Sequence, residues 1–459
     1  MNLQAQTLKP GFNKNEYINI LNMMAHSFVD TGYKKNFDFP SSHVLKYNSA
    51  EMGLLNQWTL WSNDKDQIII NIRGTVQNPV SWLENFYAAM VPANGSLKLD
   101  TNFTFDYKLA QDPKASVHIG WLIGTAYLQR DILPRIDSAY KKGVRNIILT
   151  GHSQGGGITY LMTAYLHYLQ KDKKLPADIR FKTYCSAAPK PGNLYFAYDY
   201  ESYTQMGWAY NVVNESDWVP EVPFSIQTVT DFNKTNPFTD AKTVIEKQSF
   251  KTHIAMKLIY NKLDKPSREA QENFTKYLGK TAASFVKNSL NNYSEPSYKN
   301  TVHYTRCGNY IVLKADEHYF KIFPDSKDQI FVHHLHMPYL YLTKKLNWND
   351  ESSIYSNWEL ISINDKLINP EYPNIISINK AGVSGQIACN SFNMSCVLNE
   401  DSVSNKKPAV STMKMCEENK MKTDQEFFKA LELTTNYKLQ NDLLYFYKDD
   451  KLLILMKKK

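Results

Sequence analysis

The chain has 459 residues, of which 43% are apolar and 21% charged, so it holds enough core material for one to three globular domains. This composition excludes a disordered, a collagen-like and a small disulfide-framework protein. The net charge of +8 is spread along the chain without a long basic block, which argues against nucleic-acid binding and leaves a weak attraction to anionic lipid interfaces.

Strand-like and helical runs alternate through most of the chain, which is the pattern of an α/β domain with a mostly parallel central sheet. In chain order we predict a buried strand at 67–72, a helix at 121–140, a strand at 144–150, a long helix at 155–170, and strands near 180–187 and 210–214. The chain has no run of eighteen or more apolar residues, so we expect no transmembrane segment.

The pattern changes after these strands. A Lys-rich, mostly helical stretch covers about residues 225–290, and a loop is expected at 291–296. The apolar runs 310–313 and 319–322 stand on either side of a polar turn and predict a β-hairpin.

A second domain is expected at the C-terminal end. Beyond about residue 350 the chain consists of short β-like runs separated by Asn, Asp, Lys and Gly. We therefore predict two domains, 1–347 and 352–459, with a linker at 347–351.

The strongest local signal for catalysis is the run Gly-His-Ser-Gln-Gly at 151–155, between a predicted strand and a predicted helix. A serine at such a sharp turn needs neighbours without side chains, so that the backbone folds tightly and its Oγ stands clear. The N-terminus of the following helix adds positive potential for a developing oxyanion. We predict that Ser153 is a nucleophile, and the alternative is an ordinary Gly-rich turn.

A serine hydroxyl needs a base and an acid to act as a nucleophile, and in α/β-hydrolases these follow the serine with the acid first. Asp217, just past a predicted strand, is the best acid, although a turn or helix-cap aspartate is the alternative. His333, His334 and His336 are the candidates for the base. Three close histidines also suggest a metal site, but no Cys, Asp or Glu pattern supports one, and we expect no metal or organic cofactor.

Five motifs stand in chain order at 72–75 with Trp82 downstream, at 117–121, at 151–156, at 185–193 and at 217–220. Together they resemble the class 3 lipases of the α/β-hydrolase superfamily over about residues 60–345. In the same order, the family's patterns for these five motifs are R-G-[ST] with a downstream Trp, V-H-x-G-aromatic, the nucleophile elbow, G-x-P-x-x-G-N and D-x-V-P. This sequence departs at Gln154, where the family usually has Leu, and at Ala187, where Gly is usual.

The resemblance implies an α/β-hydrolase domain that cleaves a lipid or other ester. It assigns Ser153 as the nucleophile and Asp217 as the orienting acid. It assigns the backbone N–H groups of Thr75 and Gln154 as the oxyanion donors. In the family the catalytic His opens the last helix of the domain, a few residues before a Tyr. His334 fits this position with Tyr339 and is preferred, while His336 is the alternative.

Two segments exceed what a compact member of the family needs. The stretch 225–300 reads as a helical insertion that could cap the pocket or bind a partner. Residues 83–110 occupy the position of the family's lid, with a plain surface loop or helix as the alternative. An exposed apolar face there would mark an interfacial enzyme, and its apolar residues are Phe86, Tyr87, Met90 and Val91.

The C-terminal region, about 355–457, resembles a META domain through its motifs at 357–360, 383–392, 411–416, 426–431, 443–446 and 452–455. The resemblance implies a small curved sheet with one helix and no catalytic role. It also implies an extracytoplasmic (secreted or periplasmic) location, although residues 1–9 show no apolar core of a signal peptide. Cys389 and Cys416 stand at the two signature cysteines, so a disulfide between them is implied in an oxidising compartment.

Two functions stay open at this stage. The first is a serine carboxylester hydrolase, of triacylglycerol lipase or carboxylesterase type, with an ester or lipid substrate and peripheral contact with a lipid interface. The alternative is a catalytically weak binding or envelope-associated protein that keeps the fold. The ordered Ser153, Asp217 and His334 favour the first, since a scaffold has no need of them.

Overall fold

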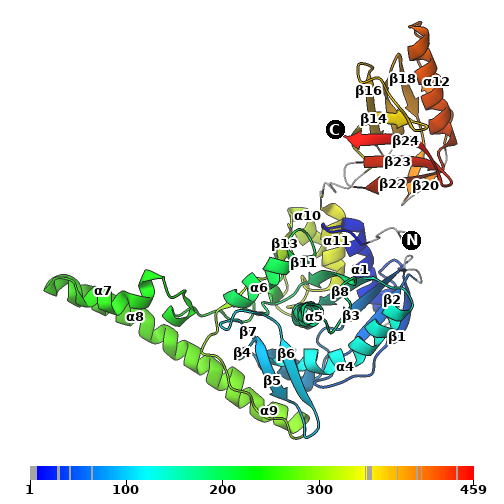
Figure 1. Cartoon of the computed structure of the whole chain (residues 1–459). Helices are drawn as coiled ribbons and strands as arrows, with labels where there is room; N and C mark the ends of the chain where they lie inside the picture. Colours follow the sequence, from blue (N-terminus) through cyan, green and yellow to red (C-terminus); the bar gives the residue numbers. More distant parts are fainter. Residues whose placement is uncertain are drawn as a thin grey trace. The chain divides into compact units, whose positions relative to one another are not determined.

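The computed structural model forms two compact units, residues 1–346 and 347–459, and each is described by itself (Figure 1). It describes residues 8–27, 31–40, 43–63, 66–346, 348, 354–379, 381–399, 402–404, 406–440 and 443–459. The predicted linker at 347–351 lies outside the described residues except for Trp348. In the described ranges, no helix is both long and apolar enough to cross a membrane.

The N-terminal unit is built on a seven-stranded sheet in the order β1-β2-β3-β8-β9-β11-β13. These strands are Val44–Asn48, Trp58–Ser62, Gln67–Ile72, Asn146–His152, Arg180–Ser186, Ala209–Asn214 and Asn309–Leu313. The β1–β2 and β2–β3 pairs are antiparallel, and every later pair is parallel. The predicted α/β fold with a mostly parallel sheet is therefore confirmed.

Both faces of this sheet are covered by helices, because successive side chains of a strand point to opposite faces. Ile68 and Ile70 pack in one buried cluster with the helices α4 (Ile119–Lys141) and α5 (Gln154–Lys171). Ile69 packs in a second cluster with α1 (Lys14–His26) and α11 (His336–Lys345). Strand β3 thus reads as a continuous apolar run.

Short elements surround this core. They are α2 (Thr31–Lys34), α3 (Pro79–Phe86), α6 (Leu194–Thr204) and the 3-10 turns Val219–Glu221, Val229–Asp231 and Pro237–Asp240. A four-stranded antiparallel sheet has the order β12-β10-β7-β4, formed by Tyr304–Thr305, Gly192–Asn193, Ser116–His118 and Met90–Pro92. A separate hairpin joins β5 (Asn94–Lys98) and β6 (Thr104–Lys108).

The segment 83–110 does not present the apolar face that would mark an exposed lid. Tyr87, Met90 and Val91 are fully buried, because the chain there enters the four-stranded sheet and the main core. Phe86 differs from them and is 59% exposed at the end of α3.

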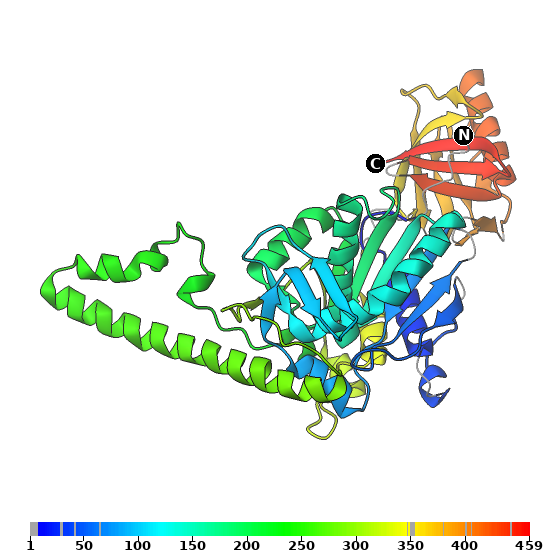
Figure 2. The same cartoon turned by 60° about the horizontal axis from the view of Figure 1, so that its bottom comes forward.

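The stretch predicted as a helical insertion contains α7 (Ala241–Glu246), α8 (Phe250–Thr275), a π-helical turn (Lys276–Thr281) and α9 (Ala282–Ser289). Its C-terminal end is anchored, because Ala283 and Val286 of α9 lie in the main core and Ala89 N–H donates to the Leu278 carbonyl. Helix α7 and the first half of α8 project away from the rest of the unit (Figures 1 and 2).

The predicted hairpin at 310–322 is wrong. Residues 309–313 form β13 and pair with β11, whereas Glu317–Ile322 is helix α10. The Asp316 side chain caps this helix by accepting from Tyr319 N–H at 2.8 Å, and Glu317 adds a negative charge at the helix N-terminus. The cap stops the second run from turning back as a strand.

The C-terminal unit is an antiparallel sheet that packs against one helix, α12 (Glu418–Leu433) (Figure 1). The strand order is β19-β20-β22-β23-β24-β14-β16-β17-β18-β21, and β15 (Lys366–Leu367) pairs with β14. In that order the strands are Val397–Asn399, Ser402–Ser404, Asn436–Gln440, Leu443–Lys448, Lys451–Lys458, Asn357–Ile363, Asn374–Asn379, Gly382–Ile387, Asn390–Met394 and Val410–Ser411. Its core includes Trp358, Phe427 and Phe446.

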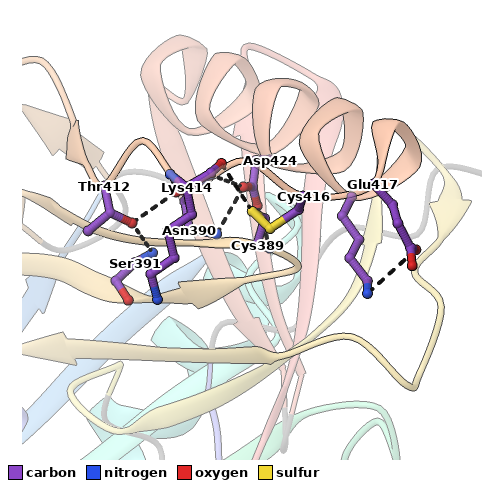
Figure 3. Close-up of a disulfide and its surroundings, with 9 residues drawn as sticks. Cys389, Asn390, Ser391, Thr412, Lys414, Cys416, Glu417 and Asp424 are labelled. Carbon is purple, nitrogen blue, oxygen red and sulfur yellow. Dashed lines mark hydrogen bonds and ion pairs between the residues drawn. A yellow bond between two sulfur atoms is a disulfide. The ribbon is translucent and has the colours of Figure 1, made fainter.

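A disulfide joins Cys389 to Cys416, with 6.2 Å between their Cα atoms (Figure 3). The carboxylate of Asp424 on α12 holds the same turn, because it accepts from the backbone N–H groups of Cys389 at 3.3 Å and Asn390 at 3.0 Å. It also accepts from Asn390 Nδ2 at 2.8 Å. The disulfide and this carboxylate tie strand β18 to the start of α12.

Candidate active site

Ser153 stands at the turn between β8 and α5, with backbone angles of φ 60° and ψ −131°. This left-handed conformation is costly for a residue with a side chain and is concentrated at functional sites. The flanking glycines are required by space, since a Cβ on Gly151 would lie 2.3 Å from the Gly155 carbonyl oxygen and one on Gly155 would lie 2.2 Å from that of Ile72. The serine side chain is partly exposed at the N-terminus of a long helix.

Asp217 and His334 lie far apart in the chain but meet in the structure, with 2.7 Å between Asp217 Oδ2 and His334 Nδ1. Asp217 follows β11 and its side chain is fully buried. Two further donors hold this carboxylate, namely the Tyr339 hydroxyl, at 2.7 Å from Oδ2, and Val219 N–H, at 3.0 Å from Oδ1. The aspartate is thereby fixed in one orientation against the imidazole.

The nucleophile turn and the segment that carries His334 are tied together by His152. Its Nε2 lies 2.6 Å from the His334 carbonyl oxygen, and its Nδ1 lies 3.0 Å from Ser186 Oγ. Within the described ranges, Ser153 Oγ makes no hydrogen bond to His334. Such bonds are often long or misaligned before substrate binds.

The other two histidines of the run have different partners. His336 opens α11 and its Nδ1 lies 3.0 Å from the Tyr33 hydroxyl. Burial, helped by the neighbouring His334, lowers the pKa of His336 to about 3, so it is neutral. His333 Nδ1 lies 2.7 Å from the Tyr319 hydroxyl. Of the three, His334 is the one that reaches Asp217.

Thr75 and Gln154 face each other across the turn. The Thr75 hydroxyl donates to Gln154 Oε1 at 2.8 Å and accepts from Asn85 Nδ2 at 2.9 Å. Gln154 is the first residue of α5, so its backbone N–H belongs to the unbonded donors at the start of a helix. The side chains of the two predicted oxyanion residues therefore contact each other. Gln154 also follows Ser153 directly in the chain.

With this geometry in view, the family model for lipase (class 3) matches residues 69–227, and the model for the META domain matches residues 352–459. The chain carries a class 3 lipase domain and a META domain. The first of these families consists of ester-hydrolysing enzymes, so the predicted resemblance and the predicted class of enzyme are confirmed.

Solved structures of fungal lipases are similar to the lipase domain at low identity. The lipase of Rhizopus microsporus var. chinensis is 20% identical, with a TM-score of 0.34, over 47% of this chain and 71% of its own. The triacylglyceride lipase of Rhizomucor miehei is 19% identical, with a TM-score of 0.33, over 47% and 77%. A lipase of Yarrowia lipolytica is 17% identical, with a TM-score of 0.34, over 48% and 79%. Comparison with curated protein sequences finds no significant match.

A buried carboxyl group lies near Gln154 in the lipase domain, and no sequence motif indicates it. Glu84 of α3 is fully buried, and its Oε2 accepts from Asn56 Nδ2 at 2.9 Å. Burial raises the pKa of Glu84 well above its usual range, although hydrogen bonds with Asn56, Gln154 and Gly124 oppose this. A Leu at 154, the usual residue of the family, could not accept the hydrogen bond that the Thr75 hydroxyl donates.

The motif at 117–121 supports Thr75 through Asn85. His118 is buried, stacks on Trp121 at 3.8 Å between ring centroids, and has its Nε2 3.2 Å from the Asn85 carbonyl oxygen. Trp121 Nε1 donates to Asn85 Oδ1 at 3.0 Å, which turns the Asn85 amide toward Thr75. Desolvation lowers the pKa of His118 to about 3, so this imidazole is neutral.

One side of the lipase domain's His334 faces the ring of Phe331, which in turn contacts two tryptophans. Phe331 lies 5.8 Å from the His334 ring, 6.0 Å from Trp82 and 5.4 Å from Trp218, measured between centroids. Trp82 in turn contacts the exposed Phe86 at 6.4 Å. The surroundings of the candidate base are therefore apolar on this side.

Proposed function

We propose that the lipase domain is a serine carboxylester hydrolase in which Ser153, His334 and Asp217 act as the catalytic triad. The observation that carries this proposal is the 2.7 Å contact between His334 Nδ1 and the buried Asp217 carboxylate. The strained backbone of Ser153 and the tie between His152 and the His334 carbonyl support it, because they hold nucleophile and base on neighbouring segments.

In the first half of the reaction, Ser153 Oγ attacks the ester carbonyl carbon while His334 Nε2 takes the hydroxyl proton. Asp217 accepts the Nδ1 proton of His334 and stabilises the imidazolium that forms. The tetrahedral oxyanion is held by the backbone N–H groups of Thr75 and Gln154, each worth about 10²–10³ in rate. Collapse breaks the bond to the alkoxy oxygen, which leaves as an alcohol with the proton from His334.

In the second half, His334 removes a proton from a water molecule that attacks the acyl-serine. The oxyanion donors are used again, and Ser153 regains its proton as the free acid leaves. The reaction needs no group besides these side chains, the backbone donors and water.

We propose that the substrate has an apolar acyl or alkyl group. The ring of Phe331 beside His334, with Trp82 and Trp218 packed on Phe331, supports this, because an apolar chain gains by leaving water against these rings. They favour a lipid ester over a small polar ester.

Hydrolysis of p-nitrophenyl esters of several chain lengths tests the triad, with Ser153→Ala as the control. We expect Ser153→Ala and His334→Ala to remove nearly all activity above background, by a factor of at least about 10³. The matched variant His336→Ala should retain most of the activity. If wild type and Ser153→Ala have equal rates, the domain is a binding platform; if His336→Ala alone is inactive, the base is His336.

We further propose that the protein works outside the cytoplasm. The Cys389–Cys416 disulfide supports this location, because disulfides persist in oxidising compartments. Protein from its native compartment should then contain three titratable thiols after denaturation, from Cys185, Cys307 and Cys396. Five thiols would contradict the proposal.

A further inference from the structure

The arm, defined here as residues 237–263, exposes large apolar side chains to an unusual extent. It comprises a 3-10 turn, α7 and the first half of α8, and it projects from the lipase domain (Figure 2). Seven of its apolar side chains are at least 44% exposed: Phe238, Val244, Phe250, Ile254, Leu258, Ile259 and Leu263. Exposed apolar groups gathered in one place mark a binding surface.

The apolar residues of α8 form two lines along the helix. Phe250, Ile254 and Leu258 follow each other at four-residue spacing, and Ile259 and Leu263 form a second line beside them. The opposite side of α8 packs on α7, where His253 Nδ1 lies 3.1 Å from the Ile245 carbonyl oxygen. The two lines therefore face away from the arm's own partner helix.

The charge of this surface is mainly positive, because the arm contains five lysines and two carboxylates, Asp240 and Glu246, both of which precede residue 247. Residues 247–263 contain Lys247, Lys251, Lys257 and Lys262 but no Asp or Glu. At 100° per residue, Lys251 and Lys262 fall between the two apolar lines of α8. In the described part of the chain, none of these four lysines forms an ion pair with a carboxylate.

We propose that the arm docks on the surface of a membrane that contains anionic phospholipid. A helix whose exposed side carries Phe, Ile and Leu with Lys between them can lie in the membrane interface, where its apolar side chains reach the acyl boundary and its long lysine side chains extend to the phosphates. The inference goes beyond the proposed function, because docking requires no hydrolysis.

Charge decides between this occupant and the other candidates. A second copy of the arm placed symmetrically would bring five lysines of each copy together, with only Asp240 and Glu246 of each copy to offset them. An acidic protein would pair with the lysines but must also bury apolar side chains that are spread over most of the arm. A lipid surface satisfies both properties at once.

Vesicle co-sedimentation of the full chain carrying Ser153→Ala tests the proposal without consuming the lipid. We expect binding to vesicles of phosphatidylglycerol and phosphatidylcholine in equal parts, at least about 30-fold tighter than to phosphatidylcholine alone, and a marked loss on raising NaCl from 0.1 to 0.5 M. Equal binding to both vesicles, or binding to neither, overturns the proposal.

Matched variants locate the binding surface. Changing Lys247, Lys251, Lys257 and Lys262 together to Gln should weaken binding at least about 100-fold, at about fivefold for each lysine. The control changes four exposed lysines elsewhere to Gln, namely Lys142, Lys174, Lys429 and Lys451, and should weaken binding much less. If the two quadruple variants bind alike, the attraction is diffuse and the proposal fails.

The apolar part is tested by Ile254→Ser with Leu258→Ser and Ile259→Ser, which should lower binding to both kinds of vesicle. The same changes in a chain with intact Ser153 should leave hydrolysis of p-nitrophenyl acetate within about twofold of wild type, which shows that the lipase domain is folded. Two results would replace the lipid by another occupant: an arm-dependent dimer in light scattering without vesicles, or binding to polyglutamate but not to anionic vesicles.

Discussion

The hydroxyl of Thr75 donates a hydrogen bond of 2.8 Å to Oε1 of Gln154, the residue that follows the candidate nucleophile. This bond joins the loop after β3 to the start of α5, the two segments that supply the proposed oxyanion donors. The position after the nucleophile is usually Leu in the family, so the side-chain bond is a property of this sequence.

Thr75→Val should therefore lower activity while its isosteric size keeps the loop filled. Loss of the hydroxyl removes this bond and the acceptor of Asn85, at a cost of about 1–3 kcal/mol. We expect kcat to fall about 10- to 100-fold with little change in KM, because the loss affects the oxyanion donors. Thr75→Ser, which keeps the hydroxyl, is the matched control and should stay within about threefold. Equal kinetics for both variants would show that the bond does not position the donors.

Tyr339→Phe tests the second donor to the proposed catalytic acid. The Tyr339 hydroxyl lies 2.7 Å from Asp217 Oδ2, the same oxygen that contacts His334. Without it the carboxylate keeps His334 and Val219 N–H but loses orientation, so we expect kcat to fall about tenfold and KM to change little.

Tyr341→Phe is the control on the same helix, since its hydroxyl contacts His318 on the exposed surface. This variant should leave the kinetics unchanged. A uniform rise in KM for Tyr339→Phe with kcat intact would assign Tyr339 to substrate binding instead.

The sequence predicts the central strands and helices well because their signals are local. Strand β3 is buried on both faces, so it reads as a run of Ile, and the α5 helix follows the glycine turn directly. The predicted hairpin at 310–322 is wrong because the Asp316 side chain caps a helix, so the apolar residues that follow form α10 and not a strand. A local apolar pattern does not show which strand or helix a short apolar segment packs against.

Candidate site residues could be predicted where they belong to a sequence motif. Residues that packing alone brings to the site could not be predicted. Motif order points to Asp217 and restricts the histidine to His334 or His336, whereas the contact between Glu84 and Asn56 joins segments that no local pattern relates. The exposure of Leu258 on the arm is likewise absent from the sequence, because an amphipathic pattern does not say what covers it.

Two buried histidines predict a loss of stability at mildly acidic pH. Burial lowers the pKa values of His118 and His336 to about 3, while in the unfolded chain both titrate near 6.5. Between these values the unfolded state binds more protons, so stability is full above about pH 6.5 and falls as the pH is lowered toward 3. The loss at pH 5 is about 2 kcal/mol for each histidine.

Urea unfolding at pH 7.5 and pH 5 measures this loss. His118→Gln and His336→Gln should each reduce the difference between the two pH values by about 2 kcal/mol, whatever they do to stability at pH 7.5. The exposed His318→Gln serves as the control and should leave the difference unchanged. A pH difference that survives in both buried-histidine variants would mean that other groups dominate.

Removal of the disulfide should destabilise the META domain. The bond closes a loop with a sequence separation of 27, for which restriction of the unfolded chain gives about 3–4 kcal/mol. We expect Cys389→Ala and Cys416→Ala to lower the stability of this domain by similar amounts, and dithiothreitol to lower that of the wild type but not of either variant. Cys396→Ala, at a buried free cysteine, is the control. Its loss of stability relative to the wild type should be the same with and without reductant. A dithiothreitol effect that persists in Cys389→Ala would contradict a stabilising role for this bond.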